Sequence, residues 1–286
     1  MAIVLDNITY TYGVGTPFEK TALHGVSLTV ENGEFLGIIG HTGSGKSTFV
    51  QHLNGLLHPT TGTVTVNGVD ISASTEEAKK MRHKVGMVFQ YPEHQLFEET
   101  IAEDIAFGPK NLGLSADEVD ERVREAMKFV GLDYDTYAER SPFHLSGGQM
   151  RRVAIAGVVA MNPDFLVLDE PSAGLDPFGR EEIFEEIIRL HKEKGITVIL
   201  VSHNMEDISR IASRLVVLDK GRIVLDGEPM DIFNNHRDAL QAVGVDVPPV
   251  SVTMEYLREQ GLDVSNRVLS VDDAVQAILE GGSHVK

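Results

Sequence analysis

The sequence predicts an α/β fold built on a mostly parallel sheet with helices on its faces. Three apolar runs carry this prediction, and they span residues 34–39, 165–168 and 197–202. Short runs rich in Val, Ile and Leu are typical of strands buried on both faces of a parallel sheet. The first run is followed by a helical segment, Ser47 to Leu57, which ends before the pair His58-Pro59.

Two further subdomains are expected around this sheet. Residues 3–12 and 25–30 have the pattern of antiparallel strands, and residues 63–66 run into Asn67-Gly68, a strong hairpin signal. Between Ser115 and Val130 the apolar residues recur with a spacing near 3.6. Val119, Val123 and Met127 therefore lie with Val130 on one helical face. Together with the segment after Gln90, this helix predicts a helical subdomain over about residues 91–160.

The last part of the chain, residues 226–286, predicts a small and mainly helical C-terminal extension. Residues 229–233, 254–260 and 271–279 are predicted helices, and Pro248-Pro249 marks a connecting turn. About 60 residues bury little surface alone. We therefore expect this extension to pack on the main domain, residues 1–225, or on the extension of a partner.

A glycine-rich segment joins the first predicted strand to its helix. Gly40, Gly45, Lys46 and Ser47 match the template Gly-x4-Gly-Lys-Ser/Thr. Backbone N–H groups of such a loop surround phosphate oxygens, and the helix N-terminus adds partial positive charge. The alternative is a glycine turn that binds nothing, but the strand-loop-helix context favours an ATP site in a P-loop NTPase core. The nucleotide-binding residues predicted here are Gly40, His41, Thr42, Gly43, Ser44, Gly45, Lys46, Ser47 and Thr48.

Two adjacent carboxylates end the second predicted strand. Asp169 is the predicted Mg²⁺-holding acid, with Ser47 as a second ligand, while Lys46 would reach the β- and γ-phosphates. Glu170 is expected to point to the other side of the chain and to act as general base for the attacking water. Two solvated acids at a strand end are the alternative interpretation of this pair taken alone.

A second anion site is predicted before the catalytic strand. Ser146 is the expected N-cap of a helix. Gly147 and Gly148 have no side chains to cover the backbone N–H groups at the N-terminus of this helix. One chain thus carries two phosphate sites that cannot both serve one nucleotide. This predicts a head-to-tail dimer with two composite ATP sites.

In combination, these motifs resemble the nucleotide-binding subunit of an ABC transporter. The resemblance implies that Gln90 links Mg²⁺ and water to a transmembrane partner, and that His203 contacts the γ-phosphate. It implies that Ser146, Gly147, Gly148 and Gln149 form the signature that contacts ATP held by the opposite subunit. It also implies that residues 172–176, ending in Asp176, join the two sites. Tyr12 would stack on adenine, with Tyr10 as its competitor. Without the resemblance, His203 would more often be a packing or capping residue.

A closer resemblance is to the second ATPase of energy-coupling factor (ECF) importers, which take up vitamins and transition-metal ions. It rests on residues 90–113, on Ser141-Pro142-Phe143-His144, and on Gly174 to Arg180. It implies a heterodimer with a sister ECF ATPase, docked on a transmembrane scaffold that carries exchangeable substrate-binding membrane subunits. A homodimeric cobalt or nickel importer ATPase is the alternative. Ordinary ABC importers would lack the 90–113 region and the extension, and ATPases that act on DNA or ribosomes would need coiled-coil insertions or tandem cassettes.

The segment Gln90–Phe97 is the predicted contact with the scaffold. We expect Glu93 to pair with an arginine of a cytoplasmic scaffold helix, while Leu96 and Phe97 supply apolar contact. The alternative is that Leu96 and Phe97 are core residues and that Glu93 is a solvated charge.

Composition limits the possible functions. The 286 residues include 25 Lys and Arg against 43 Asp and Glu, a net charge of −18 that disfavours nucleic acid as a partner. The chain has no cysteine, which excludes disulfides and suits the cytosol. No apolar run has the length of a membrane span, and the N-terminus lacks a signal-peptide pattern. The resemblance to ECF ATPases implies a peripheral protein on the cytoplasmic face of the cell membrane.

Overall fold

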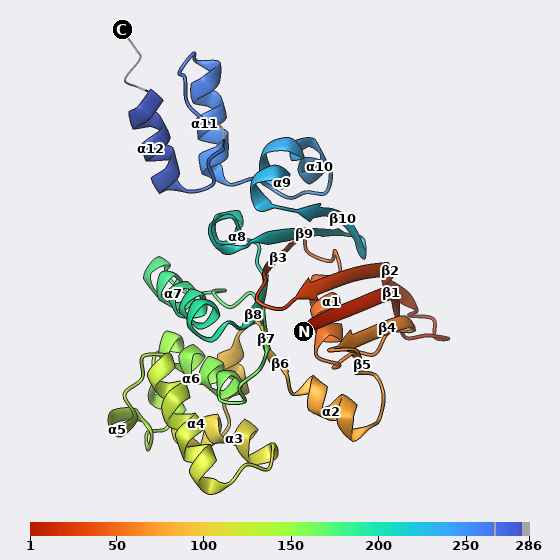
Figure 1. Cartoon of the computed structure of the whole chain (residues 1–286), viewed down its shortest axis with the longest axis vertical. Coiled ribbons are helices and arrows are strands. Elements are labelled where there is room, and N and C mark those ends of the chain that lie inside the picture. Colours follow the sequence, from red (N-terminus) through yellow and green to blue (C-terminus); the bar gives the residue numbers. More distant parts are fainter. Residues whose placement is uncertain (266, 282–286) are drawn as a thin grey trace.

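The computed structural model describes residues 1–265 and 267–281, and a six-stranded sheet forms its centre (Figure 1). Its strand order is β10-β9-β3-β8-β7-β6, and only β10 and β9 pair antiparallel. The predicted mostly parallel sheet is therefore confirmed, and every residue of β3, β7 and β8 is buried. The strands are β3 (Phe35–Ile39), β6 (Val85–Val88), β7 (Phe165–Asp169), β8 (Thr197–Val201), β9 (Arg214–Asp219) and β10 (Arg222–Gly227).

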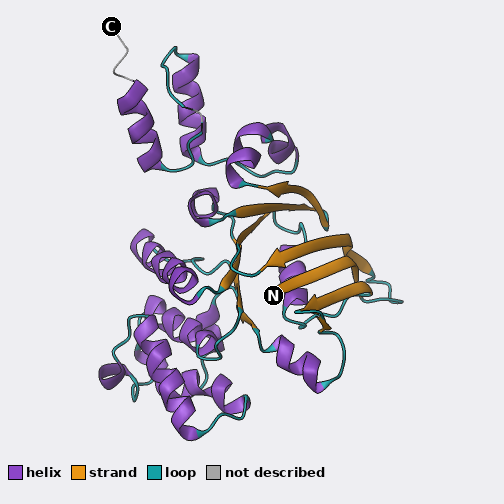
Figure 2. Ribbon diagram, viewed as in Figure 1, coloured by secondary structure: helices purple, strands orange, loops and turns teal. Residues whose placement is uncertain are grey.

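A second, antiparallel sheet has the order β2-β1-β4-β5 and lies beside the first (Figure 2). The predicted hairpin is present: Asn67 and Gly68 have φ angles of 54° and 81°, as a two-residue turn between β4 and β5 requires. Its strands are β1 (Ala2–Tyr12), β2 (Lys20–Glu31), β4 (Thr61–Val66) and β5 (Val69–Asp70). The apolar face of this sheet and one face of the central sheet enclose Phe49 of α1 (Lys46–Leu53) in a common core.

Helix α1 is shorter than predicted. It ends at Leu53 and not at Leu57, because Gly55 adopts a left-handed φ of 74° that stops the helix. Three more helices lie along the sheets, namely α2 (Glu76–Arg82), α7 (Pro177–Lys194) and α8 (Met205–Ile211).

The helical subdomain lies at one end of the central sheet (Figure 1). Ser115 caps α4 and forms a capping box with Glu118, and Val119, Val123 and Met127 are buried as their spacing predicts. These side chains belong to a core that continues under the central sheet. The elements are η1 (Pro92–Gln95), α3 (Ile101–Asn111), α4 (Ala116–Phe129), α5 (Tyr134–Tyr137), η2 (Pro142–His144) and α6 (Gly147–Val159).

The C-terminal extension consists of α9 (Pro229–Asn235), α10 (Arg237–Ala242), α11 (Pro249–Glu259) and α12 (Val271–Gly281). Its first half packs on the main core through Ile232 and Phe233. In contrast, α11 and α12 project from the domain (Figure 1) and share a small apolar cluster around Met254 and Ala274. Several large apolar side chains of these two helices stay exposed: Val252, Tyr256, Val271, Val275 and Leu279.

Candidate nucleotide site and its surroundings

One cavity of about 620 Å³ collects most of the predicted site residues. Its lining comes from segments far apart in the sequence: the end of β1, the loop before α1, the end of β6, the end of β7 and the end of β8. The carboxyl ends of parallel strands meet at one edge of a sheet, which explains the convergence. The predicted residues in the lining are Tyr12, Thr42, Gly43, Gly45, Lys46, Ser47, Thr48, Gln90, Asp169, Glu170 and His203.

The glycine loop is shaped by close backbone contacts. A Cβ at Gly40 would lie 2.3 Å from the carbonyl oxygen of Leu218, so only glycine fits there. Lys46 donates from Nζ to the carbonyl oxygens of Gly40 (2.6 Å) and His41 (3.0 Å). The ammonium group is therefore held inside the curve of the loop, where burial lowers its pKa and the nearby Glu170 and Asp169 oppose that shift.

Gly40, His41 and Ser44 support the loop without lining the cavity. His41 contacts Asp219 at the end of β9, with Nε2 and Oδ1 2.9 Å apart. Ser44 is fully buried, and its hydroxyl has no partner among the described residues.

Asp169 and Glu170 both reach the cavity, so the prediction that they point to opposite sides is wrong. Glu170 has a left-handed φ of 54°, which turns the chain at the end of β7 and brings both carboxylates to the same space. Burial raises the pKa of Asp169, and the nearby Ser47 hydroxyl opposes that shift. Oε1 of Glu170 lies 3.3 Å from Nε2 of His203. The structure therefore pairs each carboxylate with a different predicted site residue.

Burial and the charges of Asp169 and Asp207 raise the pKa of Glu170 to about 7, against the lowering effects of the His203 backbone N–H and of the Lys46 charge. Burial also lowers the pKa of His203, and the charge of Lys46 adds to this effect. A carboxyl group with a pKa near neutrality and a neutral imidazole beside it suit proton transfer at physiological pH.

The two candidate tyrosines differ in their position relative to the cavity. Tyr12 lines the cavity, is 42% exposed, and has its hydroxyl 3.0 Å from Thr48 Oγ1. Tyr10 packs against the core beside His52. Of the two rings, only that of Tyr12 stands at the cavity.

Sequence reasoning missed one side of this cavity. Lys20, Thr21, Ala22 and His24 of β2 line it, as do Lys220 and Gly221 of the β9–β10 turn. A Cβ at Gly221 would meet the carbonyl oxygen of Ala22 at 2.2 Å, so these two segments touch. The predicted strand began at residue 25, one residue after this set, and no local signal joins residue 22 to residue 221.

The predicted signature residues lie at a separate cavity of about 340 Å³, lined by Ser146, Gly148 and Gln149. Ser146 caps α6, its hydroxyl accepts from the backbone N–H of Gln149, and the Gln149 side chain bonds back to the Ser146 N–H. Asp176 caps α7 and accepts from the Gly179 N–H at 2.7 Å. The two predicted phosphate sites are therefore distinct in one chain.

Glu93 has an arginine partner within this chain. Both of its oxygens accept hydrogen bonds from Arg151 of α6, at 2.9 and 3.1 Å, and Arg151 also donates to the carbonyl oxygen of Pro171. Arg151 is 2% exposed. The contact of Glu93 with a scaffold arginine stays a prediction, whereas the predicted apolar contact of Leu96 is wrong, because Leu96 is buried in the core. Phe97 remains exposed at 57%.

Replacing Glu93 by Gln is expected to lower the free energy of unfolding at pH 7 by about 3 kcal/mol, because a buried guanidinium loses its counter-charge. Burial alone would raise the pKa of Glu93, but the hydrogen bonds and charge of Arg151 outweigh it and hold the pKa below 4.5. The stability that the ionised Glu93 carboxylate contributes is fully present above pH 4.5, and it is lost as pH falls through the lowered pKa of Glu93. Urea unfolding at pH 7 and pH 3.5 measures this; an equal difference at both pH values would contradict it.

Comparisons with known proteins show the family of the chain. A family model described as ABC transporter matches residues 23–173. The ECF transporter ATP-binding protein EcfA2 of Clostridium tetani is 53% identical over 280 residues, which cover 98% of this chain and 97% of the relative. EcfA2 of Clostridium acetobutylicum is 54% identical over 279 residues, with 98% and 97% covered.

Two solved structures have the same fold. The structure of cbiO1 from Clostridium perfringens, part of the ABC transporter complex cbiONQ, has a TM-score of 0.74 at 36% identity, with 88% of this chain and 98% of that chain covered. The dimeric ATP-binding cassette MJ0796, bound to ADP and Pi, has a TM-score of 0.70 at 32% identity, with 79% and 98% covered.

The parallel sheet, the glycine loop, the carboxylates after β7 and the separate capped helix α6 define an ATP-binding cassette, that is, an ATPase whose hydrolysis drives transport. The chain belongs to the ABC transporter family, and within it to the ECF transporter ATP-binding proteins.

Proposed function

We propose that Glu170 is the general base and His203 the γ-phosphate contact of an ATP site on this chain, in a subunit that drives uptake of a vitamin or transition-metal ion. The convergence of Lys46, Asp169, Glu170 and His203 on one cavity carries this proposal. Lys46 stabilises charge on the transferred phosphoryl group, and Glu170 takes the proton of the attacking water. Catalysis is then mainly electrostatic positioning.

The donor set of the cavity suits Mg²⁺. Ser47, Asp169 and Gln90 line the same cavity and offer hydroxyl, carboxylate and amide oxygens. Within the described ranges there is no cluster of three or more acidic, His or Cys side chains that could hold a metal alone, as suits an ion shared with phosphate oxygens. The chemistry that Mg²⁺ would supply at these residues is positive charge that offsets the negative charge of the phosphates. Ser47, Asp169 and Gln90 are the proposed ligands.

The second cavity is proposed to complete the site of a partner. Ser146, Gly147 and Gly148 present the N-terminus of α6, an anion site that lies apart from this chain's own glycine loop. A head-to-tail arrangement brings it onto nucleotide held by the opposite subunit, with Asp176 between the two sites. We propose a sister ECF ATPase as that subunit, and the exposed apolar residues of α11 and α12 as a further contact with it.

The transmembrane scaffold is proposed to dock beside Gln90. The rings of Phe97 and Phe107 stack edge to face with centroids 4.9 Å apart, and both are about half exposed. The η1 segment lies between Gln90 and Phe97. Arg151 holds this segment in place through its hydrogen bonds to Glu93, and this restrains the position of Phe97. A cytoplasmic helix of the scaffold would pack on Phe97 and Phe107. Movement of Gln90 during the ATPase cycle would then be transmitted to this helix. The substrate-binding membrane subunits are reached only through the scaffold.

We propose that the subunit lies on the cytoplasmic face of the membrane. In the part of the chain that the structure describes, no helix has the length and apolarity of a membrane span.

Replacing Phe97 by Asp is expected to lower ATP-driven uptake by at least about 10-fold, because a charge replaces an aromatic anchor at the centre of an interface. Nucleotide binding by the full-length chain should stay unchanged, since Phe97 lies outside the cavity. The measurement is uptake into liposomes that contain the complex purified with this subunit. Val224→Asp on β10, also an exposed apolar position, is the matched control. Wild-type uptake by the Phe97 variant would refute the docking surface.

A further inference from the structure

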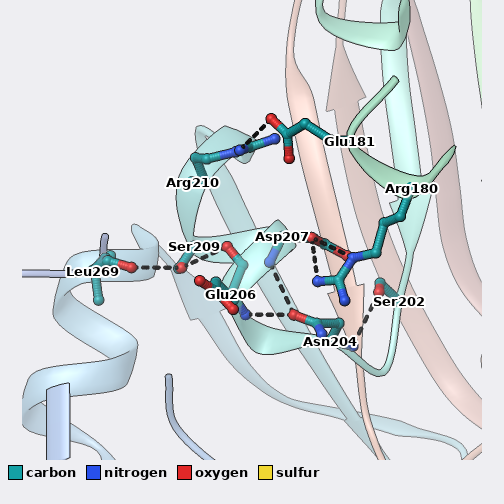
Figure 3. Close-up of polar contacts among 9 residues, drawn as sticks. All are labelled: Arg180, Glu181, Ser202, Asn204, Glu206, Asp207, Ser209, Arg210 and Leu269. Atoms are coloured by element: carbon teal, nitrogen blue, oxygen red, sulfur yellow. Dashed lines mark hydrogen bonds and ion pairs between the residues drawn. The ribbon is translucent and has the colours of Figure 1, made fainter. Parts of the chain in front are cut away.

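An ion pair between a partly exposed arginine and a buried aspartate joins two helices (Figure 3). Arg180, in the first turn of α7, donates from Nε and Nη2 to Oδ1 of Asp207 in α8, at 3.1 and 2.6 Å. Asp207 is 6% exposed, and its Oδ2 atom has no hydrogen-bond partner among the described residues. The buried carboxylate therefore depends on Arg180 for its direct counter-charge.

Asp207 is tied to His203 by a short chain of hydrogen bonds. The backbone N–H groups of Glu206 and Asp207 donate to Oδ1 of Asn204, at 2.9 and 3.1 Å. The Asn204 N–H in turn donates to Ser202 Oγ at 3.0 Å. His203 lies between Ser202 and Asn204, so these bonds restrain its backbone on both sides. A shift of Asp207 would consequently move the imidazole relative to Glu170.

Arg180 also contacts the loop of residues 172–176 through its backbone. Asp176 is the N-cap of α7, and its carbonyl oxygen accepts from the Arg180 N–H at 3.0 Å. One arginine thus connects the start of α7 with the start of α8. The same helix α8 also contacts the C-terminal extension, because Ser209 Oγ lies within hydrogen-bond distance of the Leu269 carbonyl oxygen, at 3.1 Å (Figure 3).

We propose that Arg180 is a positioning residue for ATP hydrolysis, which holds α8 through Asp207 so that His203 faces Glu170. Because Arg180 also belongs to the first turn after Asp176, it connects this geometry with the loop on which the opposite subunit closes. Closure of the dimer then sets the distance between His203 and Glu170. This inference rests on the proposed roles of those two residues.

The chain offers a matched control on the same two helices. Arg210 of α8 pairs with Glu181 of α7 at 2.8 Å, but this pair is at the surface, with side chains 38% and 51% exposed. If the α7–α8 contact serves stability alone, loss of either pair should act in the same way. If Arg180 positions His203, only its own loss should affect turnover.

The experiment compares Arg180→Gln, Arg180→Lys and Arg210→Gln in the full-length chain within the complex that it purifies with. We expect Arg180→Gln to lower kcat for ATP at least about 10-fold, since small misplacements of a reacting group are costly. KM should change less than about two-fold, since the ATP cavity itself is unaltered. Arg180→Lys should recover part of the loss, and Arg210→Gln should resemble the wild type. The imidazole NMR signal of His203 should shift in Arg180→Gln.

A wild-type kcat in Arg180→Gln would overturn the proposal. An equal loss of kcat in Arg210→Gln would also overturn it, and so would a loss of kcat in Arg180→Gln without a shift of the His203 signal. Either result would indicate that Arg180 acts through stability and not by positioning His203. If Arg180→Gln does not fold, Asp207→Asn provides the second test and should lower kcat with the same His203 shift. An unchanged kcat in that variant also overturns the proposal. The assignment of Glu170 is tested separately by Glu170→Gln, so the two failures are distinguishable.

Discussion

Replacing Glu170 by Gln is expected to lower the rate of ATP hydrolysis at least about 100-fold, because the water loses its proton acceptor. The amide keeps the shape of the side chain and removes one negative charge beside the γ-phosphate position. ATP should therefore stay bound, and the closed dimer should accumulate. Phosphate release and size-exclusion chromatography with ATP measure the two effects.

The control for this variant is Glu193→Gln, an exposed glutamate of α7. It removes the same charge from the chain at a position outside the cavity, and it should hydrolyse ATP at the wild-type rate. Undiminished hydrolysis by Glu170→Gln would remove Glu170 from the role of general base. Lost hydrolysis without accumulation of the dimer would instead indicate that Glu170 is needed for ATP binding.

Replacing Ser146 by Arg should impair the second phosphate site of this chain and leave ATP binding at its glycine loop intact. The bulky cation occupies the second cavity and obstructs the N-terminus of α6, so hydrolysis at the site completed by this α6 should fall at least about 10-fold. ATP binding at the chain's own glycine loop should persist, because that loop lies at the other cavity. Binding of a fluorescent ATP analogue to the single chain and ATPase activity of the complex give the two measurements.

Ser115→Arg is the matched control for the loss of the helix cap. Ser115 and Ser146 both form capping boxes on helices of the helical subdomain, so each variant loses about 1 kcal/mol of stability from the cap. Ser115 lies at neither of the two phosphate cavities. Reduced ATP hydrolysis in both variants would point to stability as the cause and would contradict a composite site.

The sequence predicted those parts of the fold and site that depend on local patterns. The buried runs became β3, β7 and β8, and the glycine loop, the hairpin turn and the cap of α6 follow from a few adjacent residues. Most of the predicted nucleotide residues line one cavity because parallel strands end at one edge. Their catalytic roles stay predictions that the variants above test.

What the sequence did not predict depends on contacts between distant residues. Glu93 and Arg151 are 58 positions apart, and nothing local indicates that a buried arginine takes this carboxylate. The left-handed backbone of Glu170 is likewise invisible in a run of strand-forming residues. Arg180 and Asp207 each have the pattern of ordinary helix charges, and only the packing of α7 against α8 brings them together in an ion pair with a buried carboxylate.

We propose that this subunit works opposite a sister ATPase on a shared membrane scaffold. Native mass spectrometry of the complex, captured from its own membranes through the tagged full-length chain, measures its subunit composition. We expect one copy of this chain, one sister ATPase, one scaffold and one small substrate-binding membrane subunit. Two copies of this chain without a sister ATPase would exclude this arrangement and would favour a homodimeric importer.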